Sequence, residues 1–115
     1  MSGRALLRAA AALLALTALF HATGFGSVSS WLGGERGRII QLLWVVPTVH
    51  WLSTALVWWL VADKPGMLHA VVLATAGAVL VVATGLAIAV GPAHPGVWML
   101  LAAAVIACGS LFKAD

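Results

Sequence analysis

The segment IIQLLWVVPTVHWLSTALVWWLVA occupies residues 39–62 and contains no Asp, Glu, Lys or Arg. An α-helix needs about 20 mainly apolar residues to cross the roughly 30 Å hydrocarbon core of a bilayer, so this segment is long enough to span a membrane. Three more apolar stretches lie at residues 5–25, 68–90 and 97–112. We therefore predict an all-α integral membrane protein in which four transmembrane helices form an antiparallel bundle.

The composition excludes an ordinary soluble domain. Hydrophobic residues make up 63% of the chain and charged residues only 8%, whereas soluble domains carry about 25% charged residues. So few charges cannot cover a surface that faces water, but they suffice for the ends of membrane helices. The connections are short and no internal repeat marks a second unit, so we expect one transmembrane domain over residues 1–115.

Helix-breaking residues mark the connections between these stretches. The segments DKPG at 63–66 and GPAHPG at 91–96 predict turns, because proline cannot continue a preceding helix. Such short loops join neighbouring antiparallel helices. The linker at 26–38 is longer, and two structures stay open for it: a short surface helix, or an extension of the first span. Whether this loop binds anything stays open as well.

The basic residues predict the orientation in the membrane. One side of the bundle would carry Arg4, Arg8, Lys64 and Lys113, and the other side Arg36 and Arg38. Because cytoplasmic loops are enriched in Lys and Arg, we expect both termini in the cytoplasm of a bacterial cell and the helices in its inner membrane.

Small residues recur at four-residue spacing along two of the predicted helices. Ala70, Ala74 and Ala78 form such a row in the third span, and Ala103 and Ala107 lie in the fourth. Helices associate in lipid through close contact at small residues, since the hydrophobic effect does not drive them together there. Two interpretations remain open for these rows: packing within the bundle, or docking against another membrane subunit or a second copy of the chain.

Three tryptophans, Trp44, Trp51 and Trp58, recur every seven residues in the second span. Trp44 and Trp51 therefore share one side of the predicted helix. Trp51 lies too deep for the aromatic belt at the membrane surface. A deep indole contacts either a neighbouring helix or a flat apolar ligand such as a quinone, a pigment or a porphyrin.

His50 is the deepest ionisable residue of the predicted bundle. An imidazole near the middle of a membrane points to a functional site by default. Pro47 lies within the same helix and deprives the carbonyl of Leu43 of its helical partner. His50 is therefore a candidate for ligand contact, and a hydrogen bond to an adjacent helix is the alternative. His69 and His94 lie near predicted helix ends, and we expect them at the membrane interface.

His21 is the candidate partner of His50, because two facing histidines often hold haem b between membrane helices. Their depths determine whether they meet. If the first helix ends near Thr23, His21 lies close to the membrane surface and far above His50. If that helix continues to about Ser29, a shared site becomes possible. Both outcomes remain open, and no cofactor follows from the sequence alone.

The residue inventory excludes several function classes. No acidic residue lies within a predicted span, which argues against a pump or exporter that depends on a buried carboxylate. The chain has no phosphate-binding glycine loop, no pair of carboxylates and no Cys/His array, so we predict no enzyme, and a metal site stays unknown. Six scattered basic residues form no face for nucleic acid.

These observations favour a protein that acts by association in the lipid bilayer, as an accessory subunit of a larger membrane complex or as a homo-oligomer. The alternative is a redox or lipophile-binding protein that holds haem, quinone or pigment near His50, with His21, Trp44 and Trp51 as further contacts. A small channel or transporter is a further alternative, although the spans offer it no strongly polar pathway.

Overall fold

The structure is a computed structural model that describes residues 1–31 and 33–113, and every regular element in this part of the chain is an α-helix. The helices are α1 (Gly3–Thr23), α2 (Phe25–Trp31), α3 (Gly34–Val61), α4 (Pro65–Val90) and α5 (Pro95–Ser110). The predicted all-α fold is confirmed.

Three segments are long and apolar enough to cross a membrane: Gly3–Ser27, Gly34–Val61 and Pro65–Val90. The prediction of a membrane protein with transmembrane helices is confirmed to this extent. Helix α5 has the same apolar character but only 16 residues, which gives it a length of about 24 Å. It is therefore shorter than the roughly 30 Å hydrocarbon core, and a fourth crossing remains a proposal.

The helix boundaries differ from the predicted ones mainly at the N-terminal ends. Helix α3 begins at Gly34, five residues before the predicted span at 39, and Glu35 lies in its first turn. Acidic side chains stabilise the first turn of a helix, so the helix continues beyond its apolar part. Pro65 and Pro95 each occupy the first turn of their helix, where a missing N–H costs nothing.

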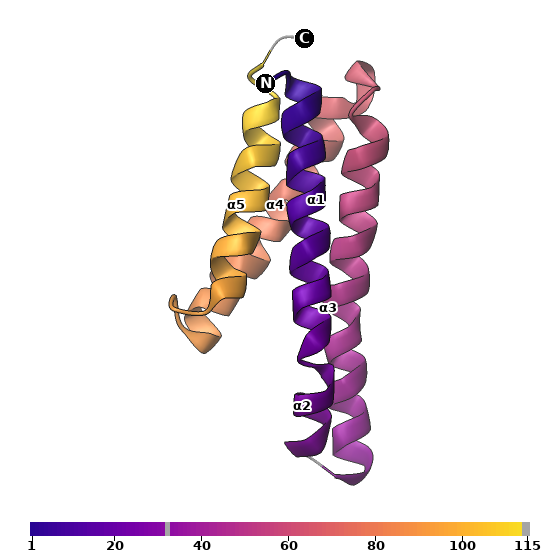
Figure 1. Cartoon of the computed structure of the whole chain (residues 1–115), viewed down its shortest axis with the longest axis vertical. Coiled ribbons are helices and arrows are strands. Elements are labelled where there is room, and N and C mark those ends of the chain that lie inside the picture. Colours follow the sequence, from indigo (N-terminus) through magenta and orange to yellow (C-terminus); the bar gives the residue numbers. More distant parts are fainter. Residues whose placement is uncertain (32, 114–115) are drawn as a thin grey trace.

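The predicted linker at 26–38 is mostly helical. It contains most of α2 and the first turn of α3. Figure 1 shows that α2 continues the course of α1 alongside α3, so that a long helical hairpin runs the length of the molecule. The molecule measures 52 Å along its longest axis. This length exceeds the hydrocarbon core, and the hairpin accounts for it.

The N-terminus, the end of α5 and the α3–α4 turn lie at one end of the molecule (Figure 1), which we call the terminal end. The opposite end carries α2, and we call it the α2 end. Helices α4 and α5 lean away from the hairpin toward the α2 end, and the turn between them stops well short of α2. The bundle is therefore splayed at the α2 end.

The core of the bundle consists of a few large aliphatic residues among many alanines. Leu7 and Leu14 on α1 and Leu100 on α5 are fully buried. Ala103 and Ala107 on α5 are buried as well, so this part of the predicted small-residue set packs inside the bundle. Alanine keeps the helix backbones close together, which gives the dispersion contacts that stabilise helices in lipid.

A side-chain hydrogen bond joins α3 to α4. The indole N–H of Trp58, which is fully buried, donates to Oγ1 of Thr75 at 2.7 Å. That hydroxyl donates in turn to the carbonyl of Val71 at 2.6 Å. The buried donor thus has a partner, which a buried indole requires.

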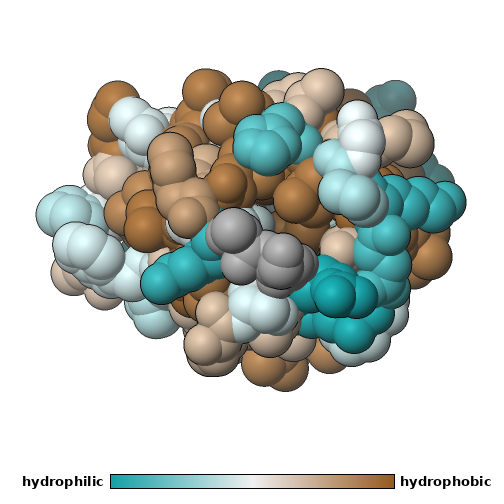
Figure 2. All heavy atoms as spheres, turned by 90° about the horizontal axis from the view of Figure 1, so that it is seen from above, coloured by the Kyte–Doolittle hydropathy of each residue, from teal (hydrophilic) through white to brown (hydrophobic). Residues whose placement is uncertain are grey.

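Charged residues gather at the terminal end. The guanidinium of Arg8 contacts the carboxylate of Asp63 at 2.6 Å, and that of Arg4 lies 3.6 Å from it. Arg8 also lies over the ring of Trp59, 5.3 Å from its centroid. Figure 2 looks onto this end and shows hydrophilic side chains beside apolar ones. The ion pairs are half-exposed, so they contribute little to stability.

Candidate functional site

The α2 end contains a cavity of about 330 Å³ between the helical hairpin and the α4–α5 turn, and we call it the crevice. It exists because α4 and α5 diverge from α1 and α3 at this level (Figure 1). Its volume lies within the roughly 300–1,000 Å³ of typical ligand pockets. Thr17, Phe20 and His21 line it from α1, Trp44 and Trp51 from α3, and Leu86 and Val90 from α4.

His21 and Trp44 form a reciprocal pair on one wall of the crevice. Their rings stack with centroids 4.2 Å apart and planes 10° from parallel. Nε2 of His21 donates to the backbone carbonyl of Trp44 at 3.1 Å, and the indole N–H of Trp44 donates to the carbonyl of His21 at 2.8 Å. Two hydrogen bonds and a stack thus hold the imidazole in one orientation.

Local sequence explains why α1 and α3 approach so closely at this pair. A Cβ atom at Gly24 would lie 2.7 Å from Cζ2 of Trp44, so only glycine leaves room for the indole. Gly26, two residues later, has nothing within 4 Å of such an atom.

Trp51 covers the other side of the imidazole. Its ring meets that of His21 at 69°, with centroids 5.0 Å apart. Trp51 is only 2% exposed, and its indole N–H has no hydrogen-bond partner among the described residues. A buried donor without a partner costs about 1–3 kcal/mol, which makes this position unusual in a well-packed bundle. His21 therefore lies between two indoles that share one side of α3.

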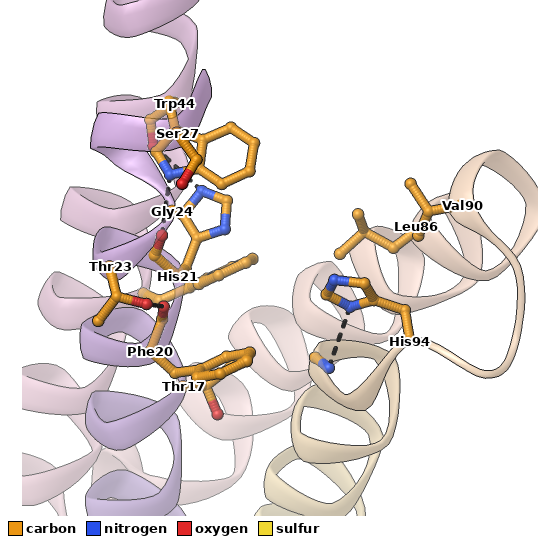
Figure 3. A pocket seen from close by; sticks show the side chains of 12 residues that line it. Thr17, Phe20, His21, Thr23, Gly24, Ser27, Trp44, Leu86, Val90 and His94 are labelled. Atoms are coloured by element: carbon orange, nitrogen blue, oxygen red, sulfur yellow. Dashed lines mark hydrogen bonds between the residues drawn. The ribbon is translucent and has the colours of Figure 1, made fainter. Parts of the chain in front are cut away.

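His94 lies on the opposite wall of the crevice, where α5 begins. Its Nδ1 accepts a hydrogen bond from the backbone N–H of Gly96 at 3.2 Å and so caps the helix. Figure 3 shows that the imidazoles of His21 and His94 face each other across the crevice, each with its second nitrogen toward the other wall. Sequence reasoning missed this role, since it placed His94 only in an interfacial turn.

The backbone partners determine which nitrogen carries the proton in each neutral ring. Nε2 of His21 donates to a carbonyl, which can only accept, so Nδ1 of His21 keeps its lone pair. Nδ1 of His94 accepts from an amide, so its proton sits on Nε2. The crevice thus offers an acceptor on one wall and a donor on the other.

His50 does not line the crevice. It lies on the exposed surface of α3, because it precedes Trp51 by one residue and so points about 100° away from it around the helix. Helix α1 ends at Thr23 and α2 follows it, so the first span covers Gly3–Ser27. His50 misses His21 because its side chain lies on the exposed side of α3. The structure brings His21, Trp44 and Trp51 together, and it pairs His21 with His94 instead of His50.

The predicted partner-binding alanines divide into two groups. Ala103 and Ala107 are buried within the bundle, whereas Ala70, Ala74 and Ala78 on α4 are exposed. The row on α4 thus faces away from the other helices.

Among residues 1–31 and 33–113, no three His, Cys, Asp or Glu side chains lie together as ligands for a metal ion. Comparisons of the chain with protein-family models, curated proteins and solved structures found no match. The site must therefore be interpreted from its own residues.

Proposed function

We propose that this protein binds a small lipophilic molecule in the crevice at the α2 end. The observation that carries the proposal is an aromatic-lined cavity of about 330 Å³ whose two imidazoles are oriented by backbone hydrogen bonds. Ligand sites are typically apolar cavities with a few fixed polar groups, and the crevice has this composition. Three of the four residues expected to contact a ligand, His21, Trp44 and Trp51, line it.

The position of the crevice suits a ligand that arrives from the membrane. Phe20 and Val90 at its margin are 45% and 57% exposed on apolar helices, so they face lipid. The turn that carries His94 is exposed to the surface. A molecule with an apolar body and a small polar head would thus keep its body among the helices and its head between the imidazoles.

The test is to identify what the native protein retains. Purification in mild detergent, followed by solvent extraction and mass spectrometry, should yield one small molecule in a defined ratio to protein. Gly24→Ala should lose it, because the added methyl displaces Trp44, whereas Gly26→Ala should keep it, because that position is open. Equal retention by both variants, or no retained molecule in the wild type, would contradict the proposal.

Association with another subunit or a second copy is the second candidate function. Two sets of exposed residues favour it: the row Ala70, Ala74 and Ala78 on α4, and the polar pair His50 and Ser53 on α3. Small residues on a membrane helix allow another helix to approach closely. Polar side chains within a span almost always face protein or water instead of lipid.

Substitution on α4 tests the association. Ala74→Leu should reduce the mass of the native particle in mild detergent, because the larger side chain blocks close helix contact. Val105→Leu, at an exposed position on α5, is the matched control and should leave the mass unchanged. A wild-type particle that contains a single chain and no companion would count against this candidate.

We propose further that α5 crosses the bilayer as a fourth span and that both termini face the cytoplasm of a bacterial inner membrane. The common location of the N-terminus, the end of α5 and the α3–α4 turn supports this topology (Figure 1), as do the basic residues at that end. In intact cells of a Cys108→Ala background, a membrane-impermeant thiol reagent should label Ala93→Cys and spare Ser2→Cys. The reverse pattern would overturn the orientation.

A further inference from the structure

We infer that the crevice recognises an aromatic hydroxyl, as in a phenol or a hydroquinone, and holds it between His21 and His94. This inference rests on the proposed ligand-binding function and narrows the class of ligand. It follows from the two imidazoles, which present complementary groups across one cavity (Figure 3).

A hydroxyl is the simplest group that satisfies both walls. It donates its proton to Nδ1 of His21 and accepts a hydrogen bond from Nε2 of His94. A quinone carbonyl or an ether oxygen can only accept, so it would pair with His94 and leave the lone pair of His21 without a partner. A primary ammonium can only donate, and it would leave the N–H of His94 unpaired. The site therefore discriminates by hydrogen-bond role, which gives stronger selectivity than shape alone.

The walls favour an aromatic ring over a saturated one. Phe20, Trp44 and Trp51 line the crevice, and aromatic pairs stabilise each other beyond the burial of their surface. The imidazole of His21 is already fixed between Trp44 and Trp51, so little rotamer entropy is lost when a ligand binds. A phenolic head thus fits both the polar and the apolar part of the lining.

The matched probes 4-bromophenol and 4-bromoanisole test the inference, since they differ only in whether the oxygen carries a proton. The full chain in lipid nanodiscs is titrated with each probe, and tryptophan fluorescence is recorded because bromine quenches nearby indoles. We expect saturable quenching by 4-bromophenol. Binding of 4-bromoanisole should be about tenfold weaker, because it leaves a buried acceptor unpaired.

Two variants assign the discrimination to the imidazoles. His94→Asn keeps a side chain that caps α5 but is too short to reach the ligand, and His21→Phe keeps the ring against Trp44 without its nitrogens. Each should weaken 4-bromophenol binding by about tenfold. Because the ether oxygen of 4-bromoanisole pairs only with His94, His21→Phe should leave its binding unchanged and His94→Asn should weaken it. His69→Asn, at an exposed position at the terminal end, is the control and should change neither. His94→Gln, whose amide can both accept and donate, should restore the binding of both probes.

The outcomes separate this inference from the proposed function. Equal binding of both probes by the wild type would overturn the hydroxyl inference and leave a lipophile site in place. Loss of phenol preference in His69→Asn would overturn it as well. If neither probe quenches saturably, the inference is wrong, and the extraction of retained molecules decides the proposed function independently. Stronger binding of 4-bromocyclohexanol than of 4-bromophenol would show that the site takes aliphatic alcohols instead.

Discussion

The terminal end and the α2 end of the bundle contain the same kinds of helix but differ in how those helices meet. Toward the terminal end, Leu7 on α1 and Ala103 and Ala107 on α5 are buried in one shared core. At the α2 end, His21 and Trp44 occupy the wall of a cavity. The difference shows that small side chains let the helices approach toward the terminal end, whereas a stacked imidazole and indole line the part of the α2 end where α4 and α5 diverge.

The two ends also use hydrogen bonds differently. Near the terminal end, the indole N–H of Trp58 donates a hydrogen bond to the side chain of Thr75 on the neighbouring helix. At the α2 end, the indole N–H of Trp44 donates to the backbone carbonyl of His21 on α1. The backbone carbonyl of Trp44 accepts from the imidazole of His21, which faces the crevice. The first arrangement only joins helices, and the second also orients a group toward a ligand.

The largest effect is expected from Leu100→Ala in the buried core of the bundle. Leu100 is fully buried, so its truncation leaves a cavity and should lower the free energy of unfolding by about 2 kcal/mol or more. Leu86→Ala, at the half-buried margin of the crevice, should cost much less because its surroundings are already open. Unfolding in detergent followed by circular dichroism measures both, and equal losses would remove the contrast between the core and the crevice.

Gly24→Ala should have the next largest effect. The added methyl would contact Trp44 at 2.7 Å, and the shift of the indole should cost roughly 1–3 kcal/mol. Gly26→Ala should be neutral or slightly stabilising, since alanine favours helix over glycine. Thermal unfolding of both variants checks the difference. A neutral Gly24→Ala would mean that the stack of His21 on Trp44 moves without cost.

Trp58→Phe should have a smaller effect. It removes the hydrogen bond to Thr75 while keeping most of the buried ring. Side-chain hydrogen bonds between membrane helices contribute about 0.6 kcal/mol on average, so the loss should be of this order plus a modest packing term. The double variant Trp58→Phe with Thr75→Val should lose less than the sum of the two single variants. Strict additivity would show that the bond does not couple α3 to α4.

The smallest effect is expected from Asp63→Asn at the terminal end. This change removes the ion pairs with Arg4 and Arg8, which are half-exposed and screened by salt. The expected loss is under about 1 kcal/mol, decreasing as ionic strength rises. Unfolding at low and high salt provides the measurement. A large loss that does not depend on salt would show that the pairs are far better shielded than their exposure indicates.

Much of the fold could be predicted because membrane spans leave a strong signal in the sequence. An uncharged segment such as 39–62 has few alternatives to a helix. The early start of α3 was missed, since Glu35 and Arg36 extend the helix through local propensity and not through hydropathy. Helix α2 was left open for a similar reason, because its seven residues are too few to show a period.

The site was predicted only in part. Spacing alone placed Trp44 and Trp51 on one side of α3, and His21 was a candidate because two facing histidines can hold a haem between helices. His94 faces His21 because of the length and tilt of α5. Neither property can be predicted from a local sequence pattern. His50 points away from the bundle because it is next to Trp51, which points inward. This could not be predicted, because the sequence does not tell which side of α3 contacts α1.

The shortness of α5 also has a consequence for the surrounding lipid. If α5 crosses the bilayer, its length of about 24 Å leaves a deficit of roughly 6 Å against the hydrocarbon core. Such a mismatch is relieved when the bilayer thins beside the helix, at a cost of a fraction of a kcal/mol per Å. We therefore expect the membrane to be locally thinner next to the α4–α5 turn. Head groups and water would then descend toward His94, and the protein would be more stable in thin bilayers than in thick ones.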